Sequence, residues 1–262
     1  MQELDLLYGD NLTIQISADK ELSIKHPKLI EIKKLGFDTY SSYISFLTMK
    51  PTDIADILWF DMKIWYEDLT QWQLFIDLYR QYPEEVKNSL LWFIGLEFVP
   101  YVDEEGRFYL YNKENEVAIN EYYFMKISDY IKKINFMPKK SDFDGCAGKI
   151  AKLYKLERQQ RRRKRESKIK SKINLSSMIS SLIWKGNKGV EIWELPIYSI
   201  YEGYFRLSAI DNYDKTMTAL YSGNIDTTKN KIDVENINWS NVISIDGDTA
   251  TGAAYDGNIT AI

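Results

Sequence analysis

"KLERQQRRRKRESKIKSK", residues Lys155–Lys172, decides how this chain is organised. Over the slightly longer range 152–172, eleven Lys and Arg residues stand against Glu157 and Glu166, so the range carries a charge of +9. The net charge of the chain is −4, so the other residues must sum to −13. A basic segment between two acidic regions favours association with an acidic surface, which can be the protein's own.

The basic segment is predicted to be helical. Its first turns carry apolar residues at Ile150, Leu153 and Leu156, whereas residues 157–168 contain none. A helix that is polar on every face either bridges through solvent or is not stable alone. Two acids cannot neutralise eleven bases, so we expect an acidic partner surface, inside or outside the protein. The expected electrostatic contact uses Arg158, Arg161, Arg162, Arg163, Lys164 and Arg165.

The pattern along the chain predicts a mainly α fold of the α+β type. Thr70 precedes Gln73 by three residues, which is a capping-box spacing at a helix start. "EFVPYV" and "RFYLYN" flank "DEEG", which predicts a β-hairpin with Gly106 in its turn. Loose alternation over residues 14–24 predicts one short strand or extended arm.

Four regions follow from these signals. We predict a helical domain over residues 1–141 with a β-hairpin near 96–112, a long basic linker helix over 142–172, a helical C-terminal domain over 173–243, and a Gly/Asp-rich tail over 244–262.

The chain contains no recognisable catalytic motif. Cys146 is the only cysteine and His26 the only histidine, so neither an internal disulfide nor a Cys/His zinc site can form within one chain. Gly148-Lys149 lacks the frame of a phosphate-binding loop, and "DGDTATG" lacks most ligands of a calcium loop. We therefore expect no enzyme activity, no catalytic residues, no metal and no cofactor.

The sequence also predicts where the protein acts. No apolar run approaches the roughly 20 residues that span a bilayer, and the first residues do not resemble a secretory signal. We expect no membrane association and a cytoplasmic location. Tyr and Trp are frequent, and such side chains suit interfaces. Candidate apolar partner contacts are Trp193, Tyr198, Tyr201 and Tyr204, with core packing as the alternative for each.

A series of landmarks resembles a known group of phage proteins. Along about residues 22–243 these landmarks are Pro27, Leu29, Glu31, Ile32, Leu35 and Gly36, then Pro51 and Asp53, then Trp72, Leu74 and Phe75, and finally Tyr221–Asp226. Their succession resembles proteins encoded in the tail gene block of phages and prophages of low-GC Gram-positive bacteria, several of them called tail assembly chaperones. The landmarks are packing and turn positions, and the tail from residue 244 is outside the resemblance.

The resemblance implies a non-enzymatic function in tail morphogenesis. A tail assembly chaperone would bind the long helical tape-measure protein in the host cytoplasm, until tail-tube protein polymerises around it. One alternative is a structural virion component of the tail, neck or baseplate, with self-association. A second is a nucleic-acid-binding phage protein that uses the basic helix. Against that second alternative, the helix has no interleaved aromatic residue for base stacking, and the remaining acidic chain would repel a polyanion.

Overall fold

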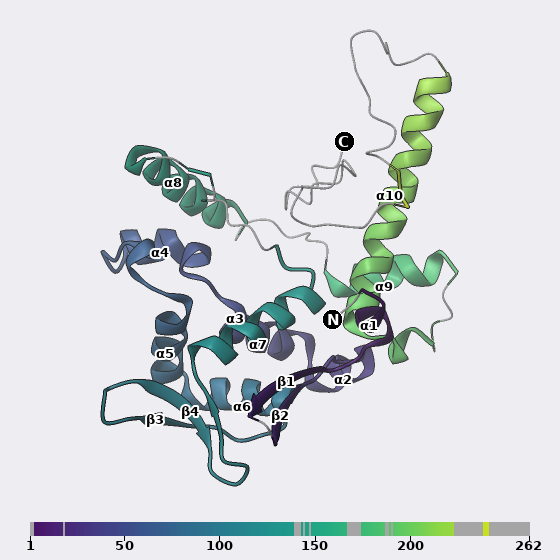
Figure 1. The fold of residues 1–262 in the computed structure, drawn as a ribbon. Coiled ribbons are helices and arrows are strands. Elements are labelled where there is room, and N and C mark those ends of the chain that lie inside the picture. The colour runs from purple at the N-terminus through teal and green to yellow at the C-terminus, as the bar shows by residue number, and fades with distance from the viewer. Residues whose placement is uncertain are drawn as a thin grey trace.

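The computed structural model describes residues 3–17, 19–138, 143, 145–146, 148–166, 174–186, 189, 191–222 and 238–240. Within these residues the fold is mainly α with two small antiparallel sheets, which confirms the predicted fold class (Figure 1). The predicted tail over 244–262 and the end of the predicted basic helix, residues 167–172, lie outside the described residues.

Short helices build most of the chain up to residue 138. They are α1 (Glu3–Tyr8), α2 (Leu29–Leu35), α3 (Phe37–Thr48), α4 (Ala55–Phe60), α5 (Gln71–Gln81), α6 (Pro83–Ile94) and α7 (Glu121–Ile134), with 3₁₀ turns η1 (Pro51–Ile54) and η2 (Tyr66–Asp68). The predicted capping box opens α5: Thr70 Oγ1 accepts the Gln73 N–H at 3.1 Å, and Gln73 Oε1 accepts the Thr70 N–H at 2.8 Å. These two bonds satisfy backbone donors that a helix start leaves open.

Two antiparallel sheets flank these helices. β1 (Leu12–Ser17) pairs with β2 (Lys20–Ile24), so the region predicted as one strand or arm is a hairpin. The β-hairpin predicted near 96–112 is formed by β3 (Val99–Val102) and β4 (Phe108–Asn112). A third strand, β5 (Val117–Ile119), extends it to a sheet of order β3-β4-β5. The Asp103 carboxylate accepts the backbone N–H groups of Glu105 and Arg107, which fixes the turn around Gly106.

One hydrophobic core joins the N-terminal helices to a segment beyond the basic helix. The C-terminal segment contributes α9 (Leu175–Trp184), the 3₁₀ turn η3 (Glu191–Glu194) and the first turns of α10 (Ile197–Tyr221). Their buried side chains in this core are Leu175, Leu182, Ile192, Ile197, Tyr198 and Ile200. Backbone bonds from Leu29 N–H to Leu195 O at 3.0 Å and from Ile197 N–H to Pro27 O at 3.0 Å tie the two segments. The regions that flank the basic segment in sequence are therefore packed together.

The basic segment forms α8 (Lys149–Glu166), which begins later than the predicted residue 142. Gly145 and Gly148 have φ angles of +74° and +87°, and such left-handed conformations cannot belong to a right-handed helix. Phe143, before these glycines, is buried against Tyr66, with ring centroids 4.7 Å apart. The apolar contact at Phe143 thus anchors the turn that leads into α8.

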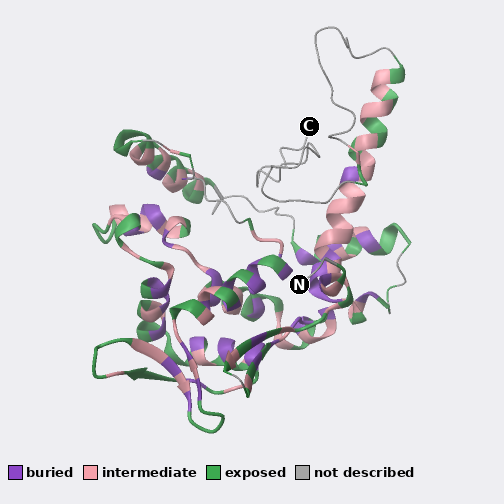
Figure 2. Cartoon of the chain, in the orientation of Figure 1, coloured by how far each residue is buried: buried purple, intermediate pink, exposed green. Residues whose placement is uncertain are grey.

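The longest described helix, α10, extends away from the body (Figure 1). Its buried residues are confined to Ile197, Tyr198, Ile200 and Ala209, and the later turns are half-buried or exposed (Figure 2). The Ser199 hydroxyl donates to Leu7 O at 3.0 Å, which holds the helix start against α1. Among the described residues, no helix combines the length and apolar content needed to cross a membrane.

Candidate functional site

The basic helix α8 lies across α4 and contacts the two 3₁₀ turns beside it (Figure 1). Leu156 is the centre of this contact and is fully buried. It belongs to a second hydrophobic cluster, apart from the main core, together with Ala55, Leu58, Tyr66 and Phe143. Burial of one leucine side chain contributes about 1.5–3 kcal/mol. The surface that contacts α8, which includes the acidic residues Asp56 and Glu67, therefore belongs to this same chain.

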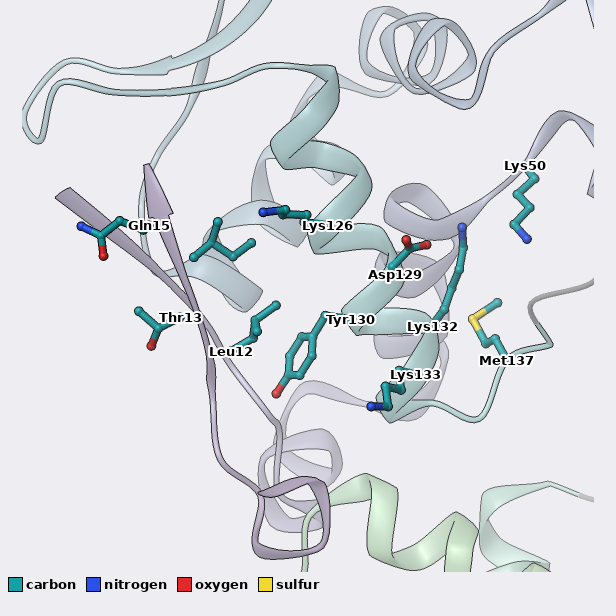
Figure 3. A pocket seen from close by; sticks show the side chains of 11 residues that line it. Leu12, Thr13, Gln15, Lys50, Lys126, Asp129, Tyr130, Lys132, Lys133 and Met137 are labelled. Carbon is teal, nitrogen blue, oxygen red and sulfur yellow. The ribbon is translucent and has the colours of Figure 1, made fainter. Parts of the chain in front are cut away.

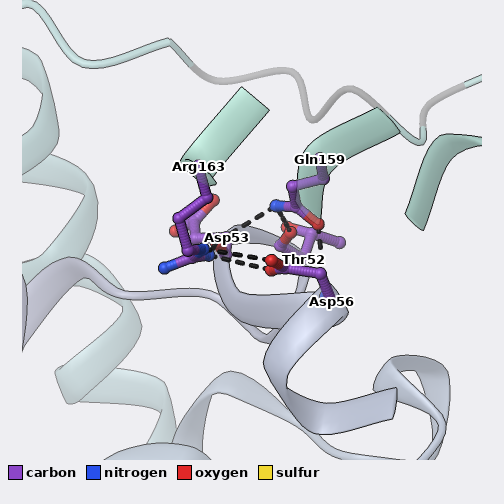
Figure 4. Close-up of polar contacts among 5 residues, drawn as sticks. All are labelled: Thr52, Asp53, Asp56, Gln159 and Arg163. Carbon is purple, nitrogen blue, oxygen red and sulfur yellow. Dashed lines mark hydrogen bonds and ion pairs between the residues drawn. The ribbon is translucent and has the colours of Figure 1, made fainter. Parts of the chain in front are cut away.

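Arg163 makes a two-point ion pair with Asp56 (Figure 4). Its Nε lies 3.0 Å from Oδ2 and its Nη2 lies 2.8 Å from Oδ1, while Nη2 also donates to the carbonyl oxygen of Asp53 at 3.1 Å. Asp56 is only 2% exposed, so Arg163 is the ion-pair partner of a buried carboxylate. A bidentate guanidinium–carboxylate pair is both strong and directional, so it also sets the rotation of α8 on α4.

Gln159, one turn before Arg163, completes the contact with η1. Its amide nitrogen donates to the carbonyl oxygens of Thr52 at 3.0 Å and Asp53 at 3.1 Å. Its amide oxygen accepts the backbone N–H of Asp56 at 3.3 Å. Gln159 thus satisfies backbone groups where η1 passes into α4.

Lys152 contacts the other end of the acidic face, where it pairs with Glu67 of η2. This bond lowers the pKa of the Glu67 carboxyl, and the Trp65 indole N–H, 2.8 Å from the same carboxylate, acts in the same direction. The docking residues Lys152, Leu156, Gln159 and Arg163 are spaced by four, three and four, so they form a single stripe along α8.

The six basic residues predicted to make the electrostatic contact divide between two sides of the helix. Arg163 points into the docked face, and Arg161 pairs with Glu157 on α8 at 3.2 Å. Arg162 is half-buried, and Arg158, Lys164 and Arg165 are exposed. α8 therefore uses one stripe for internal docking and turns further positive charge to solvent.

The four predicted aromatic contacts also differ in their surroundings. Tyr198 is buried and packs on Phe136, whose ring centroid is 4.7 Å away, and Tyr201 packs on the same ring at 6.1 Å. Trp193 is half-buried under the Lys33 ammonium, 4.4 Å from its ring. Tyr204 is half-buried and lines a surface groove. Tyr204 therefore lies at a hollow on the surface.

This groove lies between α9 and α10 and has a volume of about 410 Å³. Trp184, which was not among the residues predicted from the sequence, stands beside it with 87% of its surface exposed. Leu207 adds an apolar wall, and the Lys185–Asp211 ion pair at 3.1 Å bridges the two helices. An exposed tryptophan beside a groove is typical of a protein-binding surface.

Gly203 sets the distance between the two helices that form the groove. A Cβ at this position would lie 3.3 Å from Leu182 Cδ2, which is tighter than ordinary contact. Glycine inside a helix costs about 1 kcal/mol relative to alanine. The close approach of α9 to α10 gives this glycine a structural reason.

The described residues form a mainly helical protein whose candidate binding surfaces are the outward side of α8 and the groove between α9 and α10. Among these residues, no three His, Cys, Asp or Glu side chains lie close enough together to hold a metal ion. A family model, described as the YomV second domain, matches residues 164–244, just under a third of the chain. This family is associated with phages and prophages of Bacillus. Comparisons with curated proteins and with solved structures gave no match.

The matched range begins in the last turn of α8, contains α9 and α10, and ends where the predicted tail begins. The C-terminal part of the chain is thus similar to a phage-associated domain, in line with the phage origin that the sequence landmarks imply. The groove beside Trp184 lies within the matched range.

Proposed function

We propose that the protein is a non-enzymatic tail morphogenesis protein of a phage of low-GC Gram-positive bacteria, and that it acts as a chaperone of the tape-measure protein. The observation that carries the proposal is the groove between α9 and α10, in the part of the chain that is similar to a phage-associated domain. The landmark resemblance supports tail assembly in particular.

The groove suits an amphipathic helix as its occupant. Helix-in-groove recognition lays an apolar helical face into a hollow between helices. Trp184, Tyr204 and Leu207 supply apolar surface for such a face, and the serines at 180, 181 and 208 supply polar groups beside it. Binding would cover the exposed face of a tape-measure helix and so limit its aggregation. Growth of the tail tube would then displace the protein from its partner in the host cytoplasm.

The outward side of α8 supplies a second, electrostatic contribution. Arg158 and Arg165 are exposed, and they are not among the residues that hold α8 on α4. Positive charge on a surface raises the association rate with an acidic partner more than it raises the final affinity. An acidic helical partner would therefore be attracted by α8 while its apolar face binds elsewhere.

Co-expression tests this proposal directly. The full chain is expressed together with the tape-measure protein of the same phage genome, and the soluble fraction of the tape-measure protein is measured with and without it. We expect a large increase in soluble tape-measure protein and co-elution of the two chains. An unchanged soluble fraction, with no co-elution, would contradict the proposal.

A structural virion component is the second candidate, and β3 favours it. All four residues of this edge strand are exposed, including Val99 at 53%, Tyr101 at 57% and Val102 at 57%. Exposed apolar residues on a sheet edge suit a permanent interface. Pro100 in the same strand removes one backbone donor, which limits the pairing of a further strand there.

A further inference from the structure

A cavity of about 780 Å³ lies between β1 and α7 (Figure 3). Lys126, Lys132 and Lys133 of α7 line it together with Lys50, which precedes η1. Its volume is within the range of about 300–1,000 Å³ that small-molecule sites occupy. The cavity is separate from the groove between α9 and α10, so a ligand bound in it would be independent of the proposed function.

The lining of this cavity is strongly positive. Four lysines and one carboxylate, Asp129, are among its lining residues. Figure 3 shows the Lys132 and Lys50 side chains with their nitrogen atoms on the same side of the cavity. Two ammonium groups on the same side of a cavity attract an anion to the space between them.

Lys132 is the buried lysine of this lining. It is 5% exposed, and its ammonium donates to the neutral Gln71 Oε1 at 3.1 Å. Within the described part of the chain, Lys132 makes no ion pair. Burial lowers the pKa of Lys132 to about 8, and the nearby charge of Lys50 acts in the same direction, whereas the carboxylates of Asp129 and Asp53 act in the opposite direction. A buried ammonium that makes no direct ion pair is a costly arrangement.

The hydrogen bonds behind Lys132 hold this arrangement in place. The Gln71 amide nitrogen donates to the Ser128 hydroxyl at 2.8 Å and to Thr48 O at 3.3 Å, which turns its oxygen toward Lys132. Ser128 and Thr48 are both fully buried or nearly so. The ammonium is thus positioned by a built set of buried polar groups, as in sites that bind a ligand in one orientation.

The remaining wall of the cavity contains the polar Thr13 and Gln15 and a larger apolar part. Leu12, Ile14 and Met137 line it, with the ring of Tyr130. The Tyr130 hydroxyl donates to Asp10 O at 2.9 Å, which fixes that ring in place. An inorganic anion would leave this apolar wall uncovered, whereas an organic anion would cover it and place its charge at the lysines.

We propose that this cavity binds an organic anion, with a carboxylate or phosphate group between Lys132 and Lys50 and an apolar part against Leu12, Tyr130 and Met137. The anion would make a direct ion pair with Lys132, which Asp129 and Asp53 influence only through their nearby charge. A charge-assisted hydrogen bond to such a group contributes enough to change an affinity by tenfold or more.

Calorimetric titration of the full chain tests the site, with phenyl phosphate, benzoate, inorganic phosphate and benzyl alcohol as probes. We expect phenyl phosphate or benzoate to bind one site per chain, and the tighter of the two identifies the headgroup. Inorganic phosphate and benzyl alcohol should each bind at least about tenfold more weakly, because each lacks one half of the ligand. Lys132→Met should raise the Kd of the tighter probe about tenfold or more, and Lys113→Met, an exposed control, should leave it unchanged.

Three results would overturn the proposal. The first is the absence of saturable binding of both phenyl phosphate and benzoate. The second is binding of benzyl alcohol or inorganic phosphate as tight as that of the tighter of these two probes. The third is an unchanged Kd of the tighter probe in Lys132→Met. If Lys132→Met does not fold, Lys50→Met takes its place with the same expected loss, because Lys50 lies outside the hydrophobic core. An unchanged Kd in that variant would equally contradict the proposed site.

Discussion

Arg163 and Asp56 connect two segments that are 107 residues apart in sequence through two hydrogen bonds of 3.0 and 2.8 Å. The carboxylate of this pair is nearly inaccessible to water, whereas the guanidinium is about half exposed. Removal of the arginine would leave a buried charge without its partner, and that is more costly than the net contribution of the pair itself. The basic helix is therefore held as a specific structural element.

Arg163→Met should destabilise the protein by about 2–4 kcal/mol, because Asp56 stays buried without a counter-charge. Urea unfolding of the full chain measures the change, and hydrogen exchange should show faster exchange of α8 amides. The matched control is Arg165→Met on the exposed side of α8, which should stay within about 0.5 kcal/mol of the parent. Equal stability of the two variants would contradict the docking role of Arg163.

Trp184→Ala should weaken binding of the tape-measure protein without loss of stability. The side chain is 87% exposed, so its removal leaves no cavity in the core, yet a buried tryptophan at an interface contributes about 2 kcal/mol or more. Surface-immobilised tape-measure protein and the full chain give the Kd. Tyr8→Ala, which removes an aromatic ring of 81% exposure on α1, serves as control. The groove would be the wrong surface if the two variants bound alike.

Changing Arg158, Arg161 and Arg165 together to Glu distinguishes a protein-binding helix from a nucleic-acid-binding one. We expect the parent protein to bind a 30-bp DNA duplex no tighter than the roughly 10⁻⁴–10⁻⁶ M of non-specific binding at physiological salt. Fluorescence anisotropy over a series of salt concentrations gives both Kd and its salt dependence. A sub-micromolar Kd whose salt dependence flattens in the variant would favour the nucleic-acid function instead.

Because His26 is buried, the protein should become less stable in mild acid. Burial lowers the pKa of the imidazole from 6.5 to about 4, so the unfolded chain binds more protons than the folded protein between these values. Stability therefore rises with pH from about 4 to 6.5 and is lost as pH falls through this window, by roughly 3 kcal/mol in total. His26 is the only histidine, so one NMR resonance reports its pKa directly. An imidazole that titrates near 6.5 would contradict the buried neutral form.

The contribution of Lys132 to stability should change with pH in the alkaline range. Burial lowers its pKa from 10.5 to about 8, so the unfolded chain binds the additional proton between pH 8 and 10.5. Stability from this group consequently rises as pH increases through that window. Relative to Lys132→Met, the parent protein should gain roughly 2–3 kcal/mol between pH 7.5 and 10 in urea unfolding. Parallel curves, as expected for Lys113→Met, would show that the charge of Lys132 is not buried.

Local signals in the sequence were enough to predict the helical class, the capping box at Thr70 and the hairpin around Gly106. These features depend on residues close together in the chain. The start of α8 was predicted seven residues early, because the sequence does not reveal that Gly145 and Gly148 adopt left-handed conformations. The backbone pairing of residues 27–29 with 195–197 was also not predicted, since it joins distant segments.

The candidate surfaces were less predictable than the fold. The stripe of Lys152, Leu156, Gln159 and Arg163 is visible as helical spacing, and the last apolar residue before the basic run marks its position. The contact of this stripe with Asp56 could not be predicted, because α4 and α8 come together only in the folded chain. The cavity at Lys132 was unpredictable for the same reason, because β1, Lys50 and α7 are far apart in sequence and meet only through tertiary packing.

Quantitative mass spectrometry of two samples from one infected culture is the decisive test of the chaperone function. One sample is the material captured from lysate on the tagged full chain, and the other is purified phage particles. We expect the tape-measure protein to be strongly enriched in the capture and the protein itself to be absent from the particles. Stoichiometric amounts of the protein in particles, or a capture without tape-measure protein, would contradict a chaperone function.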